Sequence, residues 1–187
     1  MRRSTATGAI AVLLLTVAGC GGDDDGTTAA RTTPPPAPPS SPAVTAPSLE
    51  ETARTQALEV YRQWRAFQLT IDAGTPLDAA TVDRLATGPA ADLARSAADQ
   101  IARHGITTHG PDGALVPTVT VSLDAGMPTV TVVDCMDTSA RYATNRDGSP
   151  YALPSQSPRY VKTFTLTRNA SGVWQVAGMR SERDRTC

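Results

Sequence analysis

Two charged residues, Asp134 and Lys162, interrupt the apolar faces of predicted strands in this 187-residue sequence. In "TVTVVDCM", two-residue alternation puts Asp134 on the same face as Val130 and Val132. In "YVKTFTL", it puts Lys162 beside Phe164. If these faces form the core, both charges point inward. Burial raises the pKa of a carboxyl group, so an inward Asp134 could act as a general base. The alternative is that both residues lie near strand ends and meet water or a neighbouring arginine.

The two histidines, His104 and His109, lie close to Asp112 in "HGITTHGPDG". Metal sites use His and carboxylate ligands at a characteristic spacing on helices or strands. The spacing here matches no such pattern, and Gly105 loosens the backbone between the histidines. We therefore predict no metal and no other cofactor. His104 is expected to interact with the C-terminal dipole of a preceding helix.

The sequence lacks the motifs of common catalytic and nucleotide-binding sites. It contains no Gly-x-Ser-x-Gly elbow, no Gly-rich phosphate loop and no His-Glu-x-x-His. Aromatic residues make up 4% of the chain, too few for a base-stacking platform, and the formal net charge is -1. We therefore expect no nucleic-acid partner, interpret Tyr61 and Trp64 as core residues, and consider an enzyme the less favoured class.

Cys20 ends an apolar segment near the N-terminus. Arg2 and Arg3 precede "GAIAVLLLTVAG", which fits the apolar core of a signal peptide and is shorter than the roughly 20 residues of a membrane span. The residues "VAGC" resemble the bacterial lipobox, in which the cysteine receives diacylglycerol and becomes the acylated first residue after cleavage. The resemblance implies that residues 1–19 are a cleaved signal peptide and that Cys20 carries the lipid, with palmitate among its acyl chains. An ordinary cleaved signal is the alternative.

An acylated Cys20 would hold the protein on the outer, extracytoplasmic face of the cell membrane. Residues 20–48 are rich in Gly, Asp, Thr and Pro, with seven of the 15 prolines between Pro34 and Pro47. Such a segment has too little apolar surface to offset the entropy of ordering it. We therefore expect a disordered tether between the membrane and a folded domain.

The cysteine count is consistent with lipid attachment. The sequence has three cysteines, and an odd number is unusual in an exported protein. If Cys20 carries lipid, Cys135 and Cys187 remain as a pair in an oxidising compartment. Their disulfide would hold the C-terminus, which otherwise frays. Two free thiols are the alternative.

The capping signals and the apolar pattern of residues 49–187 predict a single domain that begins with three helices. "SLEE" forms a capping box at Ser48, and apolar residues then recur at intervals of three and four. Asp78 caps a short second helix that stops at Gly88. A third helix has a proline in its first turn and Gly105 past its end.

The pattern then changes to a period of two in "VPTVTVSL", "PTVTVVDCM", "RYVKTFTLT" and "VWQVAGM". A short hairpin in "ITTHGPDGAL" would precede them. Helices followed by an antiparallel meander predict an α+β fold, with three N-terminal helices on a curved antiparallel sheet of four to six strands. This order resembles the cone-like fold of nuclear transport factor 2-like and polyketide-cyclase-like proteins, whose concavity binds ligands. The stretch "VTVVDCMD" and the closing Arg-x-Cys resemble a group of uncharacterised actinobacterial lipoproteins and secreted proteins.

We therefore predict a membrane-anchored lipoprotein whose domain binds a protein partner at the cell envelope or a small ligand. The alternative is a cyclase- or isomerase-like enzyme that uses Asp134, with Lys162 beside it. An enzyme needs a cavity with a desolvated ionisable group. An interaction module has a filled core and an exposed apolar patch.

Overall fold

The structure is a computed structural model that describes residues 46–113, 117–124, 126–153 and 157–187, which belong to one compact unit. The predicted signal peptide, Cys20 and nearly all of the tether lie outside these residues. The helices are α1 (Leu49–Asp72), α2 (Ala79–Leu85) and α3 (Gly88–His104). The strands are β1 (Thr107–His109), β2 (Thr118–Ser122), β3 (Thr129–Asp137), β4 (Tyr142–Thr144), β5 (Pro150–Tyr151), β6 (Arg159–Arg168) and β7 (Trp174–Glu182).

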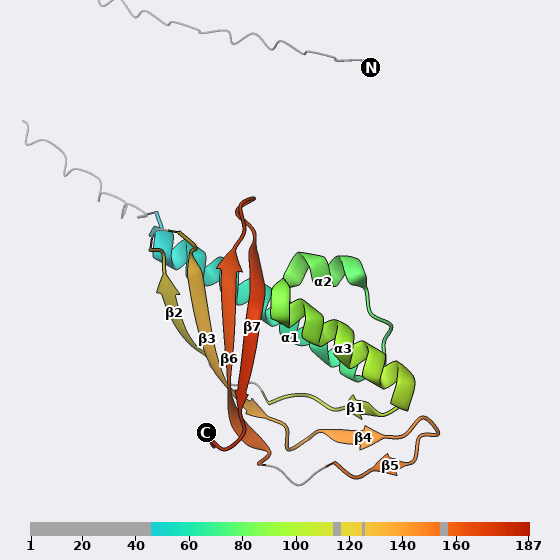
Figure 1. Ribbon diagram of the computed structural model, residues 1–187. Helices are drawn as coiled ribbons and strands as arrows, with labels where there is room; N and C mark the ends of the chain where they lie inside the picture. Colours follow the sequence, from blue (N-terminus) through green and yellow to red (C-terminus); the bar gives the residue numbers. More distant parts are fainter. Residues whose placement is uncertain (1–45, 114–116, 125, 154–156) are drawn as a thin grey trace, which may run out of the picture. The chain divides into compact units, whose positions relative to one another are not determined.

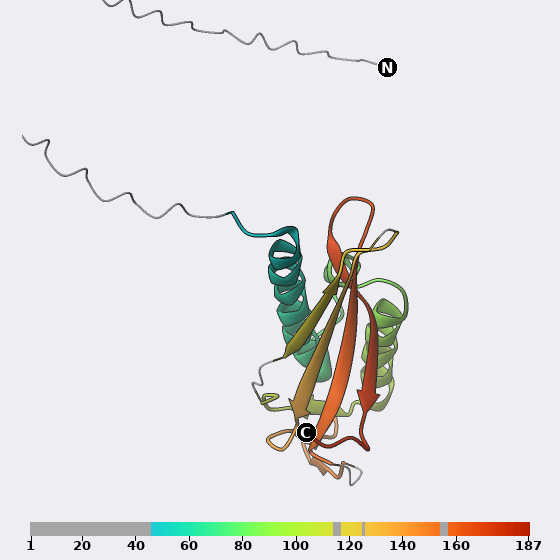
Figure 2. The same cartoon turned by 90° about the vertical axis from the view of Figure 1, so that its left-hand side faces the viewer.

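The strands form two antiparallel sheets (Figure 1). The larger has the order β2-β3-β6-β7, and the smaller has the order β1-β4-β5. α1 and α3 pack on one face of the four-stranded sheet, and no described helix covers its other face (Figure 2). The predicted α+β fold with three N-terminal helices is confirmed. The large sheet is not closed, because β2 and β7 are its edge strands and do not pair with each other.

The helix boundaries follow from the predicted capping residues. The Ser48 hydroxyl accepts a hydrogen bond from the Glu51 backbone N–H at 3.1 Å, and Asp78 Oδ1 accepts one from the Ala80 N–H at 3.2 Å. Gly105 ends α3 in the left-handed conformation, with φ of 70°. One boundary was wrong: α2 ends at Leu85, and Gly88 begins α3 instead of ending α2.

The core lies between α1, α2, α3 and the inner face of the large sheet. Tyr61 and Trp64 are buried on α1, as predicted, and the Tyr61 ring meets the Phe164 ring edge-on with centroids 4.9 Å apart. Burying a large apolar side chain stabilises the fold by about 1.5–3 kcal/mol. Helix side chains therefore cover most of the inner face of the sheet. The largest fully buried residues are Trp64, Phe164, Leu166, Val82, Val130, Val132 and Val176.

The predicted hairpin in "ITTHGPDGAL" is not seen in the described residues of this stretch, of which residues 114 and 115 are not part. β1 pairs with β4 instead, with Thr108 opposite Ala143. The hydroxyl of Thr144 lies 3.1 Å from His109 Nε2 and 3.1 Å from the Thr107 hydroxyl, which adds side-chain hydrogen bonds to this pairing. β4 and β5 were missed because strands of three and two residues are too short to show alternation.

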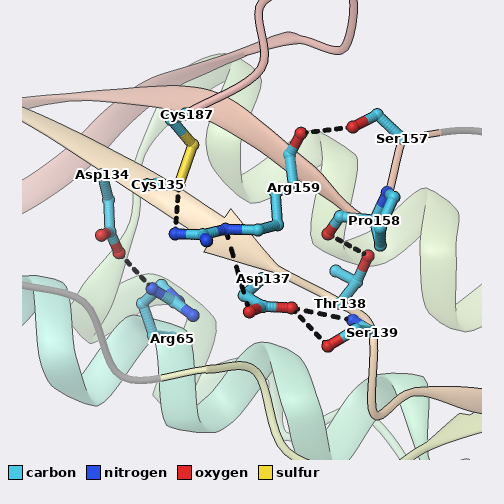
Figure 3. Close-up of a disulfide and its surroundings, with 10 residues drawn as sticks. All are labelled: Arg65, Asp134, Cys135, Asp137, Thr138, Ser139, Ser157, Pro158, Arg159 and Cys187. Atoms are coloured by element: carbon cyan, nitrogen blue, oxygen red, sulfur yellow. Dashed lines mark hydrogen bonds and ion pairs between the residues drawn. A yellow bond between two sulfur atoms is a disulfide. The ribbon is translucent and has the colours of Figure 1, made fainter.

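A disulfide joins Cys135 on β3 to Cys187, with the two Cα atoms 5.8 Å apart (Figure 3). Arg159 Nη2 donates a hydrogen bond to Cys135 Sγ at 3.9 Å. The backbone N–H of Val161 donates to the Arg185 carbonyl at 3.1 Å. The C-terminal tail is therefore held by a covalent bond to β3 and by a hydrogen bond to β6. Among the described helices, none is both long enough and apolar enough to cross a membrane.

Candidate functional site

The structure brings Asp134 and Lys162 together across two neighbouring strands. They are directly opposite each other in the antiparallel pairing of β3 and β6, on the face that the helices cover. The Asp134 side chain is 2% exposed, whereas Lys162 is half-buried. Both therefore point inward, but no ion pair forms between them in the described structure.

Asp134 pairs with two residues of α1 instead. The Tyr61 hydroxyl and Arg65 Nη1 both donate hydrogen bonds to Asp134 Oδ2, and Arg65 Nη1 also donates to the Tyr61 hydroxyl at 2.8 Å. Figure 3 shows Arg65 reaching Asp134 from the helix. Tyr61 and Arg65 can act together because residues four apart share one face of a helix. Burial, and then the hydrogen bond to Asp134, raise the pKa of the Tyr61 hydroxyl.

These contacts extend into a row of alternating charges. Arg65 Nη2 donates to Asp112 Oδ2 at 3.0 Å. Arg141 Nη1 lies 3.4 Å from Asp112 Oδ1, and Arg141 Nη2 donates to Asp72 Oδ2 at 2.7 Å. The Asp112 side chain is 5% exposed. Asp134, Arg65, Asp112, Arg141 and Asp72 form what we call the charge network.

A cavity of about 220 Å³ lies beside one end of this network, between α1 and β3. Its walls include Tyr61, Arg65, Asp112 and Asp134. Asp134 Oδ1 is buried and has no hydrogen-bond partner in the described part of the chain. The other oxygen, Oδ2, accepts hydrogen bonds from Tyr61 and Arg65. A neighbouring arginine is what we expected if Asp134 were not a general base.

Lys162 is half-buried on the inner face of the sheet and has no charged partner at bonding distance among the described residues. Its Nζ lies 5.2 Å from the centroid of the Phe164 ring. Burial is the main cause that lowers the pKa of Lys162 to about 8, and the positive charge of Arg65 is the second. Lys162 is therefore a desolvated ionisable group of this region, as Tyr61 is, although it does not line the cavity beside Asp134.

The lowered pKa of Lys162 predicts that stability rises with pH between about pH 8 and pH 10. The pKa of lysine is 10.5 when unperturbed and about 8 in the fold. The unfolded chain therefore binds more protons in this range, and the free energy of unfolding increases with pH, by an amount on the order of 1–3 kcal/mol. Above pH 10 the raised pKa of Tyr61 has the opposite effect, because the unfolded state then loses its proton first.

Urea unfolding at a series of pH values measures this dependence. Lys162→Met removes the titrating amine and keeps a chain of similar length, so its profile should lack the rise. Equal slopes in the parent and in Lys162→Met would contradict the assignment to this residue.

The residues considered as metal ligands do not converge. His109 Nε2 lies 2.9 Å from the Thr107 hydroxyl, whereas Asp112 pairs with Arg65 and Arg141. Arg146 Nη2 donates to the Ala102 carbonyl at 2.8 Å at the C-terminal end of α3, near His104. Within the described ranges, no group of three or more His, Cys, Asp or Glu side chains could hold a metal ion.

Sequence reasoning missed Arg65, Asp112 and Arg141 as members of the site. Asp112 lies in a loop and Arg141 directly before a three-residue strand, where no periodicity predicts which way a side chain points. Arg65 did carry a usable signal, because it follows Tyr61 by four residues, beside the apolar stripe of α1.

Comparison with known proteins gives no family. No family model matches the sequence, and no curated protein matches it. One similar solved structure is the intermembrane space region of the chloroplast protein ARC6, with 11% identity and a TM-score of 0.47, covering 70% of this chain and 96% of that chain. Another is Aln2 from a Streptomyces species, with 18% identity and a TM-score of 0.38, covering 75% of this chain and 95% of that chain. These similarities are too weak to support a functional argument.

Proposed function

We propose that this protein is a membrane-anchored lipoprotein of the extracytoplasmic face, and that its α+β domain is an interaction module for a protein partner. Cys20 would carry the acyl chains, and residues 20–48 would link them to the domain. The disulfide between Cys135 and Cys187 supports this location, because such bonds persist in oxidising compartments and are rare in the cytosol.

The observation that favours an interaction module is the position of the free apolar surface. Helix side chains cover most of the inner face of the large sheet, whereas Tyr142, Tyr151 and Leu153 are exposed on and beside the small sheet. They line a hollow of about 470 Å³ on its surface. Exposed apolar groups gathered in this way are typical of protein interaction sites. A photo-crosslinking amino acid at position 142 should give a defined crosslinked product in intact cells. The same amino acid at position 93 should not give this product, because Leu93 is exposed on α3 and not on the small sheet.

The lipid anchor predicts that Cys20→Ser releases the protein from the membrane fraction. Stable attachment requires two or more acyl chains, since one chain gives only marginal and reversible binding. Without the thiol, no diacylglycerol can be attached, and the expected shift is from nearly all membrane-bound to mostly soluble. Fractionation of cells followed by intact mass measurement tests this. An unmodified Cys20 in the parent protein would contradict the proposal.

Catalysis at Asp134 is the second candidate. It is favoured by the unpartnered Oδ1 oxygen of this residue, which has no hydrogen-bond partner in the described ranges, and by the adjacent cavity of about 220 Å³. A general base must be able to take up a proton near the working pH. An NMR titration of the Asp134 carboxyl carbon tests this, and a midpoint near the ordinary value of about 4 removes the hypothesis.

A further inference from the structure

Large apolar side chains are exposed where the chain from Cys20 would enter the domain. Leu49 is the first residue of α1, and its side chain is exposed. Leu123, directly after β2, and Met127, shortly before β3, are exposed as well, and so is Val173, directly before β7. We call these four residues, which come from three separate segments, the apolar tip.

The three segments meet at one end of the large sheet. The backbone N–H of Arg168 donates to the Pro128 carbonyl at 3.2 Å, which joins the turn after β6 to the turn before β3. Arg54 Nη1 donates to the Val119 carbonyl at 3.0 Å, so the first turns of α1 lie beside β2. Figures 1 and 2 show the start of α1 at the same end as these two turns, and the small sheet at the opposite end. The apolar tip is therefore distinct from the patch on the small sheet.

A hollow of about 670 Å³ lies between the two turns, and Met127 and Arg168 both line it. Arg168 Nε donates to the Gly172 carbonyl at 2.8 Å, which holds the guanidinium at the hollow. Its two terminal nitrogens make no hydrogen bond or ion pair to any residue that the structure describes. They are therefore available to a phosphate group, whose oxygens match the planar donor set of an arginine.

A lipid surface offers both kinds of contact at once. Its headgroups present phosphate oxygens to an arginine, and the acyl boundary beneath them accepts apolar side chains. The hollow is lined mainly by small and polar residues, so it offers little apolar area to a protein side chain. The anchor favours the same occupant, because the segment from Cys20 would join the domain at Leu49, within the apolar tip.

The charges at this end do not by themselves attract anionic lipid. Glu50, Glu51 and Asp124 lie in or beside the segments of the apolar tip and outnumber Arg54 and Arg168. Long-range attraction of a membrane-bound protein to anionic lipid requires an excess of basic residues. We therefore expect the contact to depend on apolar insertion and to form on zwitterionic phosphatidylcholine.

We propose that the apolar tip docks on the extracytoplasmic surface of the membrane, with Arg168 on a lipid phosphate. The proposal rests on the proposed lipid anchor, because a contact of four side chains is weak and becomes populated only when a tether holds the domain near the bilayer. In this orientation the small sheet faces away from the membrane, where a protein partner can reach it.

Chemical coupling of Cys20 to a lipid tests docking separately from the natural anchor. In the chain from Cys20 onward, this residue has the only free thiol, because Cys135 and Cys187 form the disulfide. A maleimide lipid in phosphatidylcholine vesicles therefore attaches the chain whether or not cells acylate it. Met127→Trp places a fluorophore in the apolar tip, and brominated acyl chains quench tryptophan on contact. The two native tryptophans, Trp64 and Trp174, are buried and give a constant background.

The emission added by Met127→Trp should fall by about half or more in brominated vesicles, since the side chain would lie at the acyl boundary. Tyr142→Trp is the matched control and should not be quenched, because Tyr142 is 58% exposed, against 66% for Met127, but lies on the small sheet. Adding Val173→Asp to Met127→Trp should abolish the quenching. Adding Leu93→Asp should preserve it, because Leu93 is exposed on α3, outside the apolar tip.

The proposal is overturned if Met127→Trp is quenched no more than Tyr142→Trp, or if Val173→Asp leaves the quenching unchanged. A crosslink from position 127 to another protein in intact cells, without quenching, would also overturn it and assign the apolar tip to a protein. None of these results bears on acylation of Cys20, which fractionation of Cys20→Ser tests.

Discussion

Replacing Arg65 with methionine should lower the free energy of unfolding by about 3 kcal/mol, because it removes the positive charge that two buried carboxylates share and leaves Asp134 with only the Tyr61 hydroxyl and Asp112 with only Arg141. Arg65 contacts Asp134 and Asp112, whose side chains are 2% and 5% exposed. Methionine keeps much of the length and the apolar contacts of the arginine stem, so the loss should come mainly from the charge. Urea unfolding near pH 7 measures it.

The matched control is Arg95→Met. Arg95 also pairs with two carboxylates, Asp83 at 2.7 Å and Asp92 at 3.4 Å, but its side chain is 45% exposed, against 16% for Arg65. Exposed ion pairs contribute about 0–1 kcal/mol, because water solvates the partners once the pair is broken. Losses of equal size in the two variants would show that burial of the network does not determine its effect on stability.

The large elements of the fold could be predicted because each has a local physical signal. Ser48 and Asp78 cap helices through their own side chains, and Gly105 ends α3 because it adopts positive φ without strain. Strand β3 alternates between buried and more exposed residues along its whole length, and β6 does so from Thr163 onward. The small sheet could not be predicted, since its strands are too short to show alternation and β1 pairs with β4 over a long sequence separation, as in Thr107 with Thr144.

The candidate site was predictable only in part, for a related reason. Alternation correctly placed Asp134 on the inner face, because that rule depends only on neighbouring residues. Its partner Arg65 is 69 residues away in sequence, and no local pattern indicates which arginine of an arginine-rich chain will reach it. A buried carboxylate needs a hydrogen-bond donor or a positive charge beside it. The sequence therefore indicates that Asp134 has a partner, but only the structure identifies that partner as Arg65.

Breaking the disulfide with Cys135→Ser should lower the free energy of unfolding by about 4 kcal/mol, the value that the chain-entropy model gives for a loop of this length. Cys135 and Cys187 are separated by 52 residues in sequence. The bond restricts the unfolded chain, and in the fold it fixes the tail after β7. Unfolding in urea, with and without a thiol reductant, measures the loss.

The tail provides a second, local readout that separates release of the C-terminus from general destabilisation. Arg183 and Arg185 are exposed cleavage sites for trypsin, and in the parent the tail between them and Cys187 is tied to β3. Cleavage at Arg185 should leave the last two residues attached through the disulfide in the parent and release them in Cys135→Ser, because only the parent has a second covalent link. Cys20→Ser is the matched control, because it removes a cysteine that is not part of the disulfide. It should change neither the stability of the domain nor the product of trypsin cleavage. If Cys135→Ser were as stable as this control, the disulfide would contribute nothing to the stability of the fold.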